Sequence, residues 1–182
     1  MEVERFVELW GGDVKQFPGE FYLFLKELEK IPHKKILEIG VSEGGTIKYW
    51  SEIADCVIGI DLKIKDFPLK DNMILIEGDS CQVEGSVTDR DIDMVFIDGC
   101  HDYDAVLQDY EIYSEFVKPG GMIAFHDIDW SGAHELFYDL PQEKHFVDTS
   151  TVLPDEIAKL RCIDSKHDKP MVRTNTLGWV FK

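Results

Sequence analysis

The residues of this sequence best suited to proton transfer stand just beyond a buried apolar run. Asp98 follows the run at 93–97, and His101 stands three residues later, before a segment with helical spacing. A carboxylate can hold a divalent cation, and an imidazole, which titrates near neutral pH, can receive a proton. The Asp98-x-x-His101 spacing therefore predicts a site for acid–base chemistry that faces a pocket.

A glycine turn after an earlier apolar run indicates a nucleotide site. The turn contains Gly40, Ser42 and Gly44, and Asp61 closes the next apolar run, 61 − 40 = 21 residues after the first glycine. Glycine is needed where the backbone adopts positive φ or approaches a ligand closely, and a carboxylate about 20 residues on accepts hydrogen bonds from both ribose hydroxyls. We expect one strand–helix–strand unit with Asp61 on a ribose.

The glycine pattern departs from the dinucleotide fingerprint Gly-x-Gly-x-x-Gly. Ser42 stands where the second glycine belongs, and Glu38 lies two residues before Gly40. An acid at this place suits a ligand with an ammonium group better than a ligand with two phosphates. An ordinary strand-to-helix turn in another α/β protein remains the alternative.

The run from Glu38 to Gly45, together with Asp61, resembles the first motif of class I S-adenosylmethionine-dependent methyltransferases. The resemblance implies that Glu38 lies near the methionine part of the cofactor and that Asp61 binds its ribose. Gly78-Asp79-Ser80 follows the third apolar run, where this family places an acid on the adenine amino group. The predicted contacts with S-adenosylmethionine are Glu38, Gly40, Ser42, Gly44, Asp61, Asp79, Ser80 and Asp98. A turn with only a backbone role is the alternative for the Gly-Asp-Ser segment.

Asp98-x-x-His101, followed by Lys118-Pro119-Gly120-Gly121 and His126-Asp127, resembles the small-molecule O-methyltransferases, both catechol-type and antibiotic-sugar enzymes. In those families the aspartate binds a divalent metal and the histidine is the proposed general base, so the resemblance implies that His101 and Asp98 are catalytic. The predicted metal ligands are Asp98, His126 and Asp127, for magnesium or manganese. Related enzymes have oxygen ligands at the position of His126, and an imidazole there favours manganese, iron or zinc.

Other arrangements remain open at this predicted metal site. His126 could instead satisfy backbone groups at a strand end while Asp127 caps the following turn. Asp129 could supply an oxygen ligand. Cys100, His101 and His126 could also form a zinc site, although their spacing matches no standard structural motif.

Short apolar runs alternate with segments of helical spacing along most of the chain. The predicted strands are Lys35–Ile39, Cys56–Ile60, Met73–Glu77, Asp93–Ile97, Met122–His126, Lys144–Thr149 and Thr176–Phe181. The predicted helices are Gly19–Lys30, Thr46–Ala54, Tyr103–Phe116 and Pro154–Arg161. This alternation predicts an α/β fold with a parallel sheet covered by helices. The methyltransferase resemblance, from Ile36 to Ile128, implies a Rossmann-like, seven-stranded, mostly parallel sheet in the order 3-2-1-4-5-7-6, with the last strand antiparallel and helices on both faces.

The length and composition narrow the class of protein. The 182 residues fit one domain, with an N-terminal helical segment (1–32), a cofactor-binding core (33–128) and C-terminal strands with substrate-side loops (129–182). The formal net charge of −17 opposes a nucleic-acid groove, because phosphate binding depends on lysine and arginine. The four cysteines form no Cys-x-x-Cys pair, and the N-terminus has no basic region or long apolar run. We predict a cytoplasmic protein that binds neither nucleic acid nor membrane, and a homodimer is open.

These features predict an S-adenosylmethionine-dependent methyltransferase that modifies oxygen on a small-molecule acceptor, with or without help from a divalent metal. One alternative is an NAD(P)-dependent oxidoreductase, although the missing middle glycine and the lack of a Tyr-x-x-x-Lys set count against it. A non-catalytic, methyltransferase-like binding subunit is the other. Trp130 and Trp10 are candidates for the wall of the acceptor pocket, whereas Trp50 and Trp179 are expected in the core.

Overall fold

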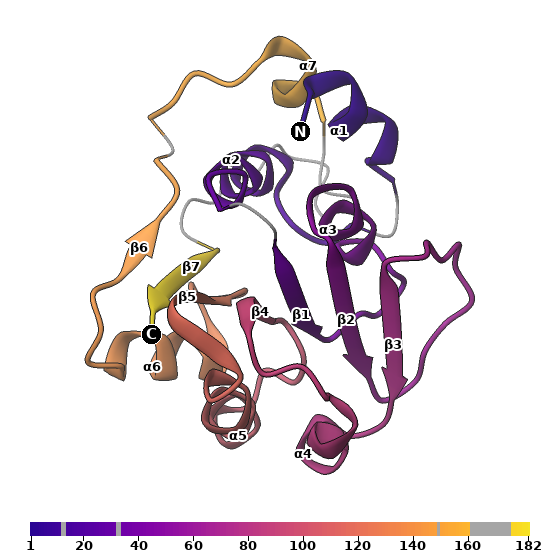
Figure 1. Cartoon of the computed structure of the whole chain (residues 1–182). Helices are drawn as coiled ribbons and strands as arrows, with labels where there is room; N and C mark the ends of the chain where they lie inside the picture. Colours follow the sequence, from indigo (N-terminus) through magenta and orange to yellow (C-terminus); the bar gives the residue numbers. More distant parts are fainter. Residues whose placement is uncertain (12–13, 32–33, 149, 161–175) are drawn as a thin grey trace.

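The computed structural model describes residues 1–11, 14–31, 34–148, 150–160 and 176–182 (Figure 1). The strands are β1 Lys35–Ile39, β2 Cys56–Asp61, β3 Met73–Glu77, β4 Ile92–Ile97, β5 Val117–Phe125, β6 His145–Phe146 and β7 Gly178–Phe181. The α-helices are α1 Val3–Leu9, α2 Pro18–Leu28, α3 Ile47–Ile53, α4 Ser80–Val83, α5 Tyr103–Ser114, α6 Ser131–Asp139 and α7 Asp155–Ala158, and a 3-10 turn, η1, spans Glu84–Ser86. Arg161, the last residue of the predicted helix Pro154–Arg161, and Cys162, one of the four cysteines, lie outside the described residues.

The described strands form one seven-stranded sheet in the order β3-β2-β1-β4-β5-β7-β6. Strands β1 to β5 are parallel, and β7 runs antiparallel to both β5 and β6. The predicted order and the antiparallel last strand are thus confirmed. Every residue of β4 is buried, as expected for a central strand whose two faces are both covered.

Helices cover both faces of the sheet and divide the core in two (Figure 1). Met94 and Phe96 of β4 join the apolar cluster beneath α1, α2 and α3, whereas Val95 and Ile97 join the cluster beneath α5 and α6. This alternation follows from the two-residue period of a strand. Trp50 is fully buried and Trp179 is 5% exposed, and both belong to the first cluster, as predicted. No helix in the described ranges has both the length and the apolar character needed to cross a bilayer.

The sequence prediction was wrong about several peripheral elements. The predicted strand Lys144–Thr149 is reduced, within its described residues 144–148, to His145–Phe146. Asp148 Oδ1 accepts a hydrogen bond from the Ser150 backbone N–H at 2.9 Å, which is a turn contact and not a ladder contact. Helix α6 was not predicted, since it begins with Ser-Gly, residues of low helix propensity. Gly132 is nevertheless required there, because a Cβ atom would lie 2.2 Å from the Tyr103 backbone nitrogen.

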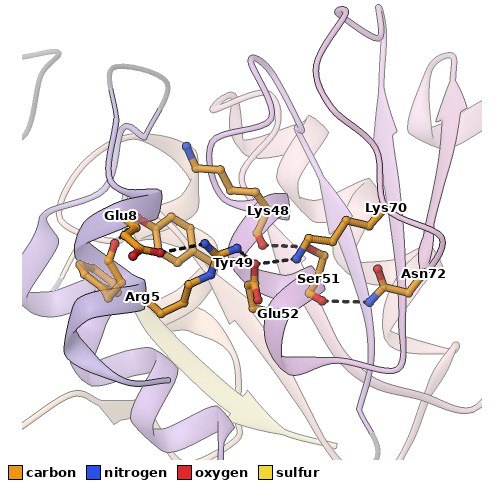
Figure 2. Close-up of polar contacts among 9 residues, drawn as sticks. Arg5, Glu8, Lys48, Tyr49, Ser51, Glu52, Lys70 and Asn72 are labelled. Carbon is orange, nitrogen blue, oxygen red and sulfur yellow. Dashed lines mark hydrogen bonds and ion pairs between the residues drawn. The ribbon is translucent and has the colours of Figure 1, made fainter.

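The N-terminal helix α1 is held against α3 by packing and by charge (Figure 2). Phe6 is fully buried, and its carbonyl oxygen accepts a hydrogen bond from the Tyr49 hydroxyl at 3.2 Å. Arg5 pairs with Glu52 of α3, which also binds Lys70 at 2.6 Å. Exposed ion pairs add little stability each, so the buried aromatic contact is the main anchor.

Helix α2 is joined to the start of β7 by a buried carboxylate. Glu20 is 5% exposed, and its Oε1 atom accepts hydrogen bonds from the backbone N–H groups of Thr176 at 2.8 Å and Leu177 at 3.0 Å. The Thr176 hydroxyl donates to Oε2 at 2.5 Å. Burial raises the pKa of Glu20, although these donors oppose the shift. The contact spans more than 150 residues of sequence and supports the antiparallel edge of the sheet.

We expect Glu20→Ala to lower the free energy of unfolding by about 3 kcal/mol, because it leaves buried donors without an acceptor. The measurement is urea denaturation followed by circular dichroism. Glu27→Ala is the matched control on the same helix, since Glu27 forms an ion pair with Lys30 at the surface, and its cost should stay below about 1 kcal/mol. Equal losses in the two variants would contradict this account of the α2–β7 contact.

Candidate functional site

A cavity of about 840 Å³ opens at the carboxyl ends of the parallel strands. The sheet order reverses beside β1, which lies between β2 and β4, and ligands of open parallel sheets bind at such a point. Most of the predicted site residues line this cavity: Gly40, Ser42, Asp61, Asp79, Ser80, Asp98, His101, His126 and Asp127. Trp130 also lines it, whereas Trp10 does not.

The strand ends are aligned because the hydrogen-bond ladder continues one residue beyond each strand. The N–H groups of Gly40, Asp98 and His126 donate to Ile60, Ile39 and Ile97, at 2.9, 2.9 and 3.1 Å, and the Gly78 N–H donates to Asp61 at 2.8 Å. The first residues after these strands therefore lie at the same height along the sheet. As a result, their side chains, far apart in sequence, line one edge of the cavity, here called the rim.

Gly40 is the residue that allows this rim to close. Its φ is +93°, and a Cβ atom would lie 2.1 Å from the Asp98 carbonyl oxygen and 2.8 Å from the Gly99 Cα. Any side chain would thus push the ends of β1 and β4 apart, besides straining the backbone. The glycine predicted at this turn has a packing reason in addition to ligand access.

The N–H groups of the glycine turn donate hydrogen bonds to acceptors of the protein itself. The Ser42 N–H donates to Asp61 Oδ2 at 2.7 Å, and the Gly44 N–H donates to Val41 at 2.9 Å. Asp61 Oδ1 accepts from the Lys63 N–H at 3.1 Å, which fixes the carboxylate at the cavity wall. Because these donors are engaged, the turn is poorly equipped to cradle a pyrophosphate.

Two predicted cofactor contacts lie away from the cavity lining. Glu38 is fully buried and accepts a hydrogen bond from the Thr46 hydroxyl, and burial raises its pKa well above the ordinary value. It therefore links β1 to the start of α3 beneath the turn. Gly44 lies against the ring of Phe67, which a Cβ atom would approach to 2.7 Å.

Three predicted residues come together on the β4–β5 side of the cavity. One ligand atom from each of Asp98, His101 and Asp127 lies within 4.8 Å of the others, and His101 Nε2 is 3.4 Å from Asp127 Oδ2. This is the cluster in the described part of the chain with the donors and spacing for a metal ion. Cys100, His126 and Asp129 are not members of it, so the oxygen ligand and the zinc arrangement considered from the sequence gain no support.

His126 is bound to the carboxylates that were expected to share a metal with it. Its Nδ1 atom is 3.1 Å from Asp98 Oδ1 and 3.3 Å from Asp127 Oδ2. Burial disfavours the charged imidazole, but the two carboxylates outweigh burial and raise the pKa of His126 well above its ordinary value. The charged ring in turn lowers the pKa of Asp127. His126 is thus an internal counter-ion for both acids.

The loop that carries His101 is held by α6. The His101 carbonyl oxygen accepts a hydrogen bond from the Gly132 N–H at 2.9 Å, and the imidazole and the Trp130 ring meet in a T-shaped contact with centroids 5.4 Å apart. Asp127 has φ +56°, which turns its side chain sharply after β5. The positions of these groups therefore depend on a helix that sequence patterning did not predict.

Sequence reasoning missed two polar residues of the site. Gln16, 2% exposed, donates from Nε2 to Asp98 Oδ2 at 2.8 Å, so both oxygens of Asp98 have partners in the protein. A glutamine in an irregular segment carries no signal that could have revealed this contact. Asp109, 3% exposed, lines the cavity from α5. The sequence does carry a signal for Asp109, because this acid stands between Val106 and Tyr113 on the helix face that is buried.

The cavity is strongly acidic. Five carboxylates line it, from Asp61, Asp79, Asp98, Asp109 and Asp127, and they outnumber the cationic side chains among the described lining residues, Lys15 and the charged His126. Acidic walls favour a ligand that carries positive charge and repel a ligand with two phosphates. The acidic walls and the engaged N–H groups of the glycine turn therefore both argue against a ligand with two phosphates.

A family model and one curated relative match part of the chain. A family model described as a methyltransferase domain matches residues 37–128. A ribosomal RNA large subunit methyltransferase E from Desulfatibacillum aliphaticivorans is 36% identical over 93 residues, with 45% of each chain covered. The chain therefore spans about half the length of this curated relative.

Solved structures share the fold. An O-methyltransferase from Bacillus cereus in complex with SAH superposes with a TM-score of 0.55 at 21% identity, covering 79% of each chain. The MycE methyltransferase of the mycinamycin biosynthetic pathway, in complex with Mg and SAH, gives a TM-score of 0.59 at 15% identity, covering 93% of this chain and 54% of MycE. At these identities the similarity establishes the fold.

We expect Asp109 to make stability depend on pH. Burial raises the pKa of its carboxyl from 3.8 to about 6, so its favourable contribution is present below pH 3.8 and is lost as the pH rises through 6. Relative to Asp109→Asn, the ligand-free protein should lose up to about 3 kcal/mol of unfolding free energy between pH 4 and pH 7. Denaturant titrations at both pH values measure this difference. Asp104→Asn, at an exposed position of α5, is the control and should show no such dependence.

Proposed function

The chain belongs to the methyltransferase-domain family, and from that premise we propose that it transfers a methyl group from S-adenosylmethionine to an oxygen of a small-molecule acceptor. The observation that carries the proposal is the acidic cavity at the strand ends, with Asp61 on one side and the Asp98–His101–Asp127 cluster on the other. Such a cavity can hold a cationic nucleoside beside groups that manage a proton.

The donor set fits S-adenosylmethionine better than a dinucleotide. The cofactor carries a sulfonium and an ammonium group, and acidic walls favour such positive charges. A pyrophosphate would need the N–H groups of the glycine turn, but these already donate hydrogen bonds to Asp61 and Val41. Asp61 would hold the ribose, and Gly40 lines the cavity beside it. Asp98 would face the methionine ammonium group.

When bound, S-adenosylmethionine supplies an electrophilic methyl group, and a divalent cation would lower the pKa of the acceptor hydroxyl. Within the protein, Asp98 and Asp127 would supply the oxygen ligands for a cation such as magnesium or manganese. His101 receives the acceptor proton on Nδ1, because its Nε2 faces Asp127, which orients the ring. His126 stays behind these acids as their counter-ion.

A small-molecule acceptor agrees with the charge of the chain better than a nucleic acid. The curated relative is a ribosomal RNA methyltransferase, which makes RNA the second candidate. RNA binding draws on lysine and arginine, but this chain carries a formal charge of −17 and five carboxylates in the cavity wall. The solved MycE structure with Mg, SAH and mycinamycin VI is an example of a small acceptor in this fold. The cytoplasmic location and the homodimer stay predictions from the sequence.

We expect S-adenosylhomocysteine to stabilise the protein and NADH to have no effect. A ligand at 100 times its Kd adds about 2.7 kcal/mol to the free energy of unfolding, which for a chain of this size shifts Tm by about 5 °C or more. Differential scanning fluorimetry gives the shift, and calorimetric titration gives Kd. Asp61→Ala should weaken binding at least about tenfold, because the ribose hydroxyls lose a charged acceptor. Asp66→Ala, an exposed acid of the adjacent loop, is the matched control.

A Tm shift with NADH and none with S-adenosylhomocysteine would favour the oxidoreductase alternative instead. Tight binding without product formation across phenol and sugar acceptors would favour the non-catalytic binding subunit.

We expect one substitution to weaken metal binding and another to impair proton transfer while metal binding is retained. Asp98→Asn should weaken manganese binding, measured in the presence of S-adenosylhomocysteine, by about tenfold or more. His101→Gln should retain manganese but lower the turnover of phenol or sugar acceptors by about 10² to 10⁴, the usual contribution of a general base. His145→Gln, on β6 away from the cavity, serves as the control and should retain both properties.

If His101→Gln lost manganese as fully as Asp98→Asn, His101 would be a ligand and the base would have to be sought elsewhere. Full turnover after exhaustive chelation would remove the metal from the proposal and leave His101 acting alone.

A further inference from the structure

The N-terminal segment reaches the candidate metal cluster through the side chain of Gln16. Its Nε2 atom donates a hydrogen bond to Asp98 Oδ2 at 2.8 Å, across 82 positions of the sequence. Gln16 is 2% exposed, so water has little access to the amide. A segment outside the strand ends thus contributes a fixed donor to one of the acids that would hold a cation.

The amide of Gln16 has one orientation that suits Asp98. Turned over, it would place Oε1 against a carboxylate oxygen, and two acceptors repel each other. In the orientation observed, Oε1 is buried and accepts no hydrogen bond from the described part of the chain. A buried acceptor without a donor is destabilising, and local costs of this kind occur at functional sites. The unpaired oxygen therefore indicates that the contact with Asp98 has a use beyond folding.

Buried contacts on both sides of Gln16 fix its backbone. Val14 is fully buried in the first core cluster. On the other side α2 begins at once, since the Phe21 N–H donates to the Phe17 carbonyl oxygen at 2.9 Å, and Glu20 of this helix is joined to the start of β7. The Gln16 amide is therefore a fixed point against which the Asp98 carboxylate is oriented.

The other oxygen of Asp98 is held from the opposite end of the sequence. Its Oδ1 atom lies 3.1 Å from His126 Nδ1, so both oxygens have partners and the carboxylate is not free to rotate. Asp98 still lines the cavity and belongs to the cluster with His101 and Asp127. Rotational freedom that a cation would have to remove is thus already lost before the cation binds.

We propose that Gln16 is a positioning residue for Asp98, and that by fixing this carboxylate it makes the cluster prefer magnesium or manganese over calcium. The inference rests on the proposed function, since it takes the Asp98–His101–Asp127 cluster as a cation site. Magnesium demands near-ideal octahedral geometry, and manganese also takes octahedral sites. Calcium instead takes roughly six to eight oxygens in a flexible arrangement. A carboxylate that cannot turn favours the first kind of cation.

The test compares the Kd values of manganese and calcium in the unmodified chain and in Gln16→Met, with S-adenosylhomocysteine at saturation. Methionine keeps an unbranched, flexible side chain and has no N–H donor. Manganese affinity should fall about tenfold or more, as is usual when an outer partner of a metal ligand is lost. Calcium affinity should change by less than about threefold, so the preference for manganese falls. Calorimetric titration gives both constants, and the electron paramagnetic resonance signal of free manganese checks the first.

Gln142→Met is the matched control. Gln142 likewise donates from Nε2, to the Tyr110 hydroxyl at 3.0 Å, and likewise has a buried Oε1 that accepts no hydrogen bond among the described residues, but it does not line the cavity. This variant should keep the manganese preference of the unmodified chain. Urea denaturation of both variants separates folding from binding, and Gln16→Met should unfold close to the unmodified midpoint, because the unpaired Oε1 is removed together with the donor.

Gln16→Asn is a second variant at the same position. It keeps the amide but is shorter by one methylene group, so its N–H₂ group no longer reaches Asp98 from the same backbone. The preference for manganese should fall in the same direction as in Gln16→Met. If Gln16→Met does not fold, the ratio of the two Kd values in Gln16→Asn decides.

An unchanged preference in the folded Gln16 variants would overturn the inference and leave the proposed function standing. Equal losses for manganese and calcium would also overturn it, since they would indicate general damage to the cluster and not a loss of fixed geometry. So would an unmodified chain that binds calcium as tightly as manganese. An unmodified chain that binds S-adenosylhomocysteine but no manganese is a separate result, because it would overturn the metal part of the proposed function and this inference with it.

Discussion

The approach of the β1 turn to the β4 turn is the constraint on which the rest of the site depends. The Gly40 backbone lies so close to the Asp98 carbonyl oxygen that no Cβ atom fits between them. This contact sets the floor of the cavity, because the N–H groups that follow β1, β4 and β5 continue the ladder at one level. The side chains of Asp61, Asp98 and Asp127 can then converge on one space.

Convergence of acids carries an electrostatic cost that the fold offsets locally. Asp98 and Asp127 lie close enough to repel each other, and the charged His126 ring between them lowers that cost. Gln16 adds a neutral hydrogen bond to Asp98 from the N-terminal segment. The remaining carboxylates, Asp61, Asp79 and Asp109, each accept a hydrogen bond from an N–H or O–H donor, so none of them is an unpaired charge in the cavity wall.

Structural acids and acids available to a ligand are distinguished by whether they line the cavity. Glu20 and Glu38 do not line it and serve as buried links: Glu20 joins α2 to β7, and Glu38 joins β1 to α3. Asp61, Asp79 and Asp109 are fixed by protein donors and line the cavity. The distinction explains why an acid next to a glycine motif, such as Glu38, can be buried support rather than a contact.

Local pattern was enough to predict the central strands, the glycine turn and the acids at the strand ends. Apolar runs, glycine at positive φ and a carboxylate at the end of a strand are properties of neighbouring residues, so Gly40, Asp61 and Asp98 could be identified from spacing. The resemblance to a family supplied the strand order. Contacts between distant segments were decided only by the tertiary structure: Gln16 meets Asp98 across 82 residues, and Gly132 of the unpredicted α6 holds the His101 loop. Such contacts depend on crossovers and loop packing, which no periodicity within a short window encodes.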